Sequence, residues 1–328
     1  MTPPTPAPST PTPSAQPVGA RAEAPLRRPA LAVTVLAGTV VLTGMIELLL
    51  QLLQSQLEWM QYVVQGSYLV LVPVSLAFGA SVLWLLAASG ITRVDARRVS
   101  RLPLLMLGLL ALSALLAPAG QLLALLLRLI GVGDESAVGY GLRTSIGAGL
   151  TSGGTILLTV IIGVLALLLL KRPPRAERTL RIPVGPVPVA VALLITALLL
   201  AASVPIQNVI SSWIALDWEA LQILFSLLTV TKGLLAALLV LAMGLLLALT
   251  AGRTRRVLWA GFIAYWVTRV LAAVLVRIFV FQMLSGAATD GGWLTPVAWT
   301  ADVIGALMLA ATAVVVIVRL VPRADSKS

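Results

Sequence analysis

Residues 220–250 read ALQILFSLLTVTKGLLAALLVLAMGLLLALT, a run in which Lys232 is the only charged residue. About 20 consecutive apolar residues are enough to cross the hydrocarbon core of a bilayer as an α-helix. Of the whole chain, 59% is hydrophobic and only 11% is charged, against roughly 25% charged residues in soluble domains. We therefore expect residues 220–250 to span a membrane.

Apolar runs of similar length recur along the 328 residues. They predict an all-α, polytopic integral membrane bundle of about eight transmembrane helices. The predicted spans are 30–53, 68–89, 102–126, 149–170, 187–208, 220–250, 257–283 and 297–320.

The ends of the chain differ in composition from the predicted transmembrane domain, 30–321. Residues 1–29 are rich in Pro, Thr and Ser, a composition that predicts a disordered cytoplasmic tail. Residues 322–328 are expected to form a second, short cytoplasmic tail.

Basic residues gather in every second loop. The N-terminal tail, the loops 91–101, 171–181 and 251–256 and the tail from Arg319 carry 18 of the 23 Lys and Arg residues. By the positive-inside rule, this asymmetry predicts a multi-pass protein of the plasma (inner) membrane with both termini in the cytoplasm. The same loops are expected to contact anionic lipids. Their distribution argues against nucleic acid as a partner.

The chain contains no Cys and no His. It therefore lacks thiolate and imidazole chemistry and the common ligands of zinc, haem and iron–sulfur clusters. The predicted spans hold no acidic pair and no nucleophile–base set. We predict no catalytic residues, no metal site and no cofactor, and expect that the protein is not an enzyme.

Five charged residues lie at membrane depth: Lys232, Arg269, Arg277, Glu47 and Asp302. A charge at the bilayer centre costs on the order of 2.5–3.5 kcal/mol on the insertion scale, so such residues usually face a bundle interior or a wet cavity. We expect an outward-facing polar vestibule in which Glu47 and Asp302 pair with Arg277 and Arg269. Lys232 would form its floor.

Uncharged polar residues extend this predicted vestibule. Gln51 and Gln54 follow Glu47 by four and seven residues, which places all three on one face of a helix. Gln222 and Thr229 share a face of the sixth span beside Lys232. We expect these four residues to line the cavity.

Three bases and two acids leave an excess of one positive charge at this depth. The excess indicates that the cavity binds or transports a small anionic or amphiphilic solute, unless Lys232 is neutral and no excess exists. Alternatively, the protein is a non-transporting accessory or scaffold subunit whose intramembrane charges pair with a partner membrane protein or a lipid. A third interpretation is structural, in which the charges form interhelical ion pairs that fix helix packing.

Similar landmarks recur in the two halves of the chain. Glu58-Trp59 follows the first predicted span and Asp217-Trp218 the fifth. Pro174-Arg175-Ala176-Glu177 closes the first half and Pro322-Arg323-Ala324-Asp325 the second. The order predicts a parallel 4+4 repeat about an axis along the membrane normal. Alternatively, interfaces and cytoplasmic loops recruit the same residue types everywhere.

The segment Ala137-Val138-Gly139-Tyr140-Gly141 resembles the TVGYG selectivity filter of potassium channels. Six residues, 131–136, separate it from the preceding apolar run, whereas a pore helix would lead directly into a filter. We interpret the match as chance. Gly149 and Gly153 open the fourth span four residues apart and are expected to let another helix approach closely.

Overall fold

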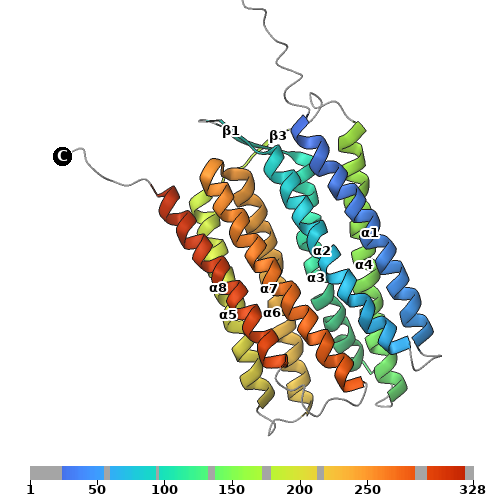
Figure 1. Ribbon diagram of the computed structural model, residues 1–328. Helices are drawn as coiled ribbons and strands as arrows, with labels where there is room; N and C mark the ends of the chain where they lie inside the picture. Colours follow the sequence, from blue (N-terminus) through green and yellow to red (C-terminus); the bar gives the residue numbers. More distant parts are fainter. Residues whose placement is uncertain are drawn as a thin grey trace, which may run out of the picture.

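A computed structural model describes residues 24–54, 60–93, 96–131, 137–171, 179–212, 218–284 and 294–321. These residues form eight α-helices and three short β-strands (Figure 1). The helices are α1 (Ala24–Gln54), α2 (Met60–Ser89), α3 (Arg101–Leu129), α4 (Ala137–Lys171), α5 (Pro186–Ser212), α6 (Trp218–Leu249), α7 (Gly252–Leu284) and α8 (Leu294–Leu320). The strands are β1 (Ile91–Arg93), β2 (Ala96–Ser100) and β3 (Thr179–Arg181). All eight helices are long and apolar enough to cross a membrane, which confirms the prediction of a polytopic helical bundle.

All eight helices begin earlier than their predicted spans, and two of these differences change an interpretation. α1 begins at Ala24, so residues 24–29 belong to the first helix and not to the tail. Proline is well tolerated at the start of a helix, and Pro25 occupies such a position. α4 begins at Ala137, so the filter-like segment is helical and its carbonyl groups are directed along the helix rather than toward a pore.

The helices follow one another around the bundle in the order α1, α2, α7, α8, α5, α6, α3 and α4, and α4 returns to α1. Near the centre, α2 also contacts α3 and α6. In Figure 1, α5–α8 and α1–α4 stand side by side as two groups.

Helix pairs in one group have counterparts in the other. The contacts of α1 with α2 and α4 correspond to those of α5 with α6 and α8, and α3–α4 corresponds to α7–α8. Between the groups, α3–α6 corresponds to α7–α2. A parallel 4+4 repeat would give this pattern, and the repeat stays a prediction. One difference is that α2 packs on α3, whereas α6 and α7 have no comparable contact among the described residues.

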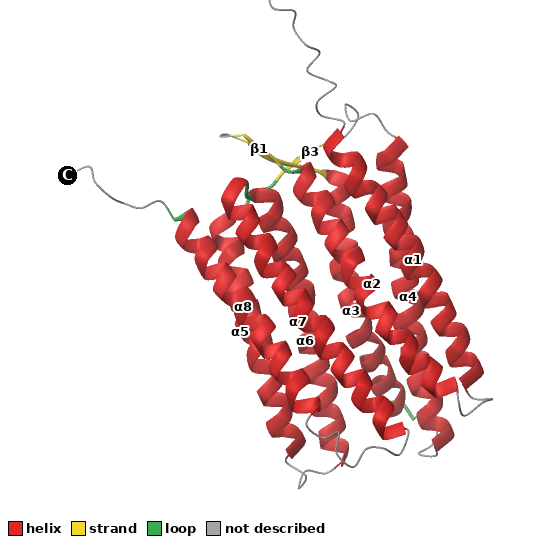
Figure 2. Ribbon diagram, viewed as in Figure 1, coloured by secondary structure: helices red, strands yellow, loops and turns green. Residues whose placement is uncertain are grey.

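The three strands form an antiparallel sheet across one end of the bundle, the sheet end, where α1 begins and α8 ends (Figure 2). The pairing of β1 with β2 and of β2 with β3 joins the connection after α2 to the connection after α4. Val99 of β2 is 1% exposed and belongs to the hydrophobic core. The sequence predicts no sheet here, because strands of three to five residues within basic loops show no recognisable alternation.

Two large hydrophobic clusters fill most of the bundle, and a third, of Ala272, Ala298 and Ala301, lies between α7 and α8. The larger one joins α5–α8 with α2, α3 and β2, and it includes Leu193, Leu246, Phe262 and Leu309, all fully buried. The smaller one lies among α1–α4. Because the larger cluster includes β2 and the first turns of α5 and α7, it closes the interior at the sheet end.

Glycines let α3 and α4 pack in near-backbone contact. A Cβ atom at Gly120 would lie 2.4 Å from the backbone oxygen of Gly147, and one at Gly147 would lie 2.5 Å from the backbone oxygen of Gly120. The prediction for Gly149 and Gly153 is wrong, because no described atom lies within 4 Å of a Cβ built at either. Both are exposed, on a different face of α4 from Gly147.

We expect Gly120→Ala to lower the free energy of unfolding by about 1–3 kcal/mol, because its methyl group overlaps the backbone of α4. Gly153→Ala is the matched control on α4. It should leave stability within about 1 kcal/mol of the parent chain, because alanine is the better helix former. Thermal unfolding midpoints in one detergent measure both effects. Equal midpoints for the two variants would contradict the close α3–α4 contact.

Candidate functional site

Three charged residues lie directly above the hydrophobic core of α6, α7 and α8. Each is seven residues, or two helical turns, from a core residue that is at most 3% exposed. Each charged residue therefore lies on the same face of its helix as the core residue, about 10 Å nearer the end of the bundle opposite the sheet. The pairs are Lys232 with Leu239, Arg269 with Phe262, and Asp302 with Leu309.

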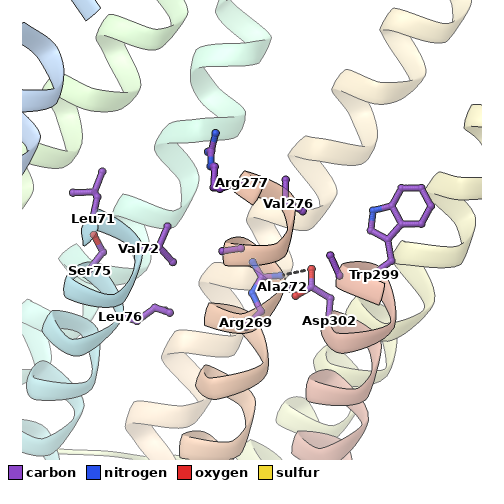
Figure 3. Close-up of a pocket in the computed structure, with 12 residues that line it drawn as sticks. Leu71, Val72, Ser75, Leu76, Arg269, Ala272, Val276, Arg277, Trp299 and Asp302 are labelled. Carbon is purple, nitrogen blue, oxygen red and sulfur yellow. Dashed lines mark ion pairs between the residues drawn. The ribbon is translucent and has the colours of Figure 1, made fainter. Parts of the chain in front are cut away.

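Arg269 and Asp302 form an ion pair between α7 and α8. Nη1 of Arg269 lies 3.0 Å from Oδ2 of Asp302, and Figure 3 shows the two side chains pointing toward one another. The side chain of Arg269 is 49% exposed and that of Asp302 24%. The pairing of these two residues agrees with the sequence prediction. The exposure shows that the protein encloses the pair only in part.

Lys232 donates a hydrogen bond to Oε1 of Gln207 on α5. The charges of Asp302 and Arg269 also act on its ammonium group, so α6, α7 and α8 share one electrostatic cluster. That cluster contains two bases and one acid, because Gln207 is neutral. The sequence pattern does not single out Gln207, although this residue is one of the few polar residues in the predicted span 187–208.

The ion pair lines a pocket of about 490 Å³ among α2, α7 and α8, here called the polar pocket. Its polar lining comes from Ser75, Arg269, Arg277, Trp299 and Asp302, and the remaining lining residues are apolar. Most small-molecule sites have volumes of about 300–1,000 Å³ and combine an apolar wall with a few polar groups. The polar pocket has both features.

Both members of the ion pair retain hydrogen-bonding capacity. A guanidinium carries five N–H donors, and a half-exposed Arg269 can present some of them to the pocket. Oδ1 of Asp302 is buried and accepts no hydrogen bond from the described part of the chain. A solute or a water molecule in the polar pocket could therefore accept a hydrogen bond from Arg269, whereas Oδ1 of Asp302 lies below the surface of the pocket.

The other predicted charges are placed differently. Arg277 also lines the polar pocket, but Figure 3 shows its side chain pointing away from the ion pair. Glu47 is 7% exposed and follows Val33 and Val40 at intervals of seven residues along the buried face of α1. It is not among the described residues that line the pocket. The structure thus gathers Arg269, Arg277 and Asp302, with Lys232 nearby, and places Glu47 in the other group of helices.

The predicted cavity-lining residues are less completely described. The side chains of Gln51, Gln54 and Gln222 lie outside the described part of the structure. Thr229 is half-buried on α6, one turn from Lys232, and is not among the described lining residues. Trp299 also lines the polar pocket, a role that its place near the start of the last predicted span does not reveal.

We expect Arg269→Ala and Asp302→Ala to be coupled energetically. Each single substitution leaves a charged partner inside the bundle, whereas the double substitution removes both charges, so the combined loss of stability should be smaller than the sum. A double-mutant cycle of unfolding free energies should give a coupling of about 0.5–3 kcal/mol. Additive effects would show that the two charges do not interact in the folded protein.

Comparison with protein-family models, with curated proteins and with solved structures finds no match to this chain. No group of three or more Asp, Glu, His or Cys side chains in the described ranges is placed to hold a metal ion.

Proposed function

We propose that this polytopic membrane protein binds a small anionic or amphiphilic solute in the polar pocket and transports it across the membrane. The observation that carries the proposal is the position of Arg269. Asp302 holds its guanidinium at 3.0 Å, and the half-exposed side chain faces a solute-sized pocket inside a membrane-spanning bundle.

The charges favour an anion as the solute. Two bases, Arg269 and Arg277, line the polar pocket with one acid, Asp302. A guanidinium fork matches a carboxylate or a phosphate, and its attraction for an anion is stronger in a low-dielectric interior than in water. An ion pair that served only to hold α7 against α8 would need neither the excess charge nor the pocket.

The hydrophobic core suggests how transport would occur. Leu239, Phe262 and Leu309 fill the interior about two turns from the charged residues, on the side of the sheet. A solute at Arg269 would therefore have access from one side of the membrane only. Passage would require the packing of α5–α8 to rearrange, as in proteins that alternate access by moving helix groups.

The sheet end would face the cytoplasm of a plasma-membrane protein. The positive-inside rule supports this orientation, because the connections at the sheet end carry most of the basic residues. Lys171, Arg181 and Arg253 are exposed at this end and would meet the head groups of anionic lipids.

We expect glycerol 3-phosphate to raise the unfolding midpoint of the purified protein, because a ligand that binds only the folded state stabilises it. Arg269→Lys keeps the positive charge opposite Asp302 but loses the planar fork. It should bind at least about tenfold more weakly, since a hydrogen bond to a charged group contributes about 1.5–3 kcal/mol. Uptake of labelled glycerol 3-phosphate into proteoliposomes should fall in parallel.

Arg253→Lys, an exposed position near the start of the same helix, is the control and should behave like the parent chain. The proposal fails if neither glycerol 3-phosphate, inorganic phosphate nor acetate stabilises the protein or enters vesicles. If, in addition, a membrane protein co-purifies with the parent chain and is lost from Arg269→Leu, the accessory-subunit alternative is supported instead.

Topology can be tested directly, because the chain has no Cys and single-cysteine variants have no background. Ile130 is 71% exposed near the end of α3, and Val321 is 49% exposed after α8. A membrane-impermeant maleimide should label Ile130→Cys in intact cells and Val321→Cys only after the cells are opened. The reverse pattern would show that the sheet end faces outward.

A further inference from the structure

A second pocket, of about 310 Å³, lies between α2 and α7 and is here called the lateral groove. Its lining is almost entirely apolar. The residues are Pro73, Leu76, Ala77 and Ala80 of α2 and Ile263, Trp266, Val267 and Val270 of α7.

The lateral groove and the polar pocket occupy different sides of α7. Ile263 and Val267 line the groove and are 54% and 61% exposed. Arg269 lines the polar pocket and shares its helix face with Phe262, which is fully buried. The groove therefore opens toward the surrounding hydrocarbon, whereas Arg269 lies on the face of α7 that is buried at Phe262.

One side chain is common to both pockets. Leu76 of α2 lines the polar pocket and the lateral groove. Small residues line the two pockets beside it: Ala77 of α2 lines the lateral groove, and Ala273 of α7 lines the polar pocket. Pro73, one turn away, has no backbone N–H and so weakens the hydrogen-bond ladder of α2 at this level. A change of rotamer at Leu76, with a small bend of α2, would join the two spaces.

We propose that the solute is an amphiphile with an anionic phosphate head and a single hydrocarbon chain. The head lies beside Arg269 in the polar pocket, and the chain passes Leu76 and lies in the lateral groove. This inference rests on the proposed function and specifies its substrate class.

Charge and continuity both favour this occupant. The two bases and one acid beside the polar pocket match an anionic head, and phosphate accepts hydrogen bonds from the guanidinium fork. The groove holds no charged residue and opens to the bilayer, where a hydrocarbon chain is the chemistry available to fill it. A wholly polar anion would use the polar pocket and leave the groove to lipid.

Three probes separate head from chain: palmitoyl glycerol phosphate with a diazirine on the chain, glycerol 3-phosphate, and the uncharged palmitoyl glycerol. The protein is placed in nanodiscs of phosphatidylcholine, and crosslinks of the diazirine probe are mapped by mass spectrometry. We expect crosslinks on the facing segments of α2 and α7. Unlabelled palmitoyl glycerol phosphate should reduce them at least tenfold, and palmitoyl glycerol should not.

Ala77→Trp fills the exposed floor of the groove and should reduce the crosslinks at least tenfold. Stabilisation by glycerol 3-phosphate should stay unchanged in this variant. Ala260→Trp is the matched control, because Ala260 is exposed on α7 and does not line the groove. This variant should retain the parent pattern.

Crosslinks spread over all lipid-facing helices, or unchanged in Ala77→Trp, would show annular lipid only and overturn the inference. If glycerol 3-phosphate still stabilises the parent chain through Arg269, the proposed function survives this failure. If neither glycerol 3-phosphate nor palmitoyl glycerol phosphate binds, both proposals fail together.

Discussion

A charge in the hydrocarbon region has to be paired or hydrated inside the protein, and the arrangement of α5–α8 depends on how this requirement is met. Arg269 and Asp302 meet it across the α7–α8 contact, at 3.0 Å. Lys232 meets it by binding the neutral side chain of Gln207. Each of the three charged residues lies on the same helix face as a core residue two turns nearer the sheet, and this is the face that is directed toward the interior.

The same requirement divides the interior into two layers. Toward the sheet, the larger hydrophobic cluster lies among α5–α8, and Phe262 and Leu309 are fully buried. Above it, the charged side chains do not fill the space, and a pocket of about 490 Å³ remains. A half-exposed guanidinium at the boundary between these layers is placed where a solute would be bound and where its further passage would be blocked.

Much of the fold follows from the sequence, because apolar runs of about 20 residues have few alternatives to a membrane-spanning helix. The pairing of Arg269 with Asp302 also follows, since both residues are charged and lie at matching depths. Depth along a helix does not reveal lateral neighbours, however. The expected vestibule therefore included Glu47, whereas packing places it among α1–α4. The sequence does not single out Gln207, because a neutral amide near the end of a span has only a small cost of insertion into the membrane. It does not single out Trp299, because an aromatic ring at that depth is equally suited to the membrane interface.

The two helix groups differ at the position of Arg269. Arg128 and Arg277 occupy similar positions in α3 and α7, 149 residues apart. With this offset, the predicted repeat would match Arg269 to Gly120. At Gly120 the backbones of α3 and α4 nearly touch, and no side chain can enter between them. At Arg269 a long side chain reaches across to α8 and is held there by Asp302. Under the predicted repeat, a close glycine contact between α3 and α4 would thus correspond to an ion pair between α7 and α8, and the polar pocket lies beside that ion pair, against α2.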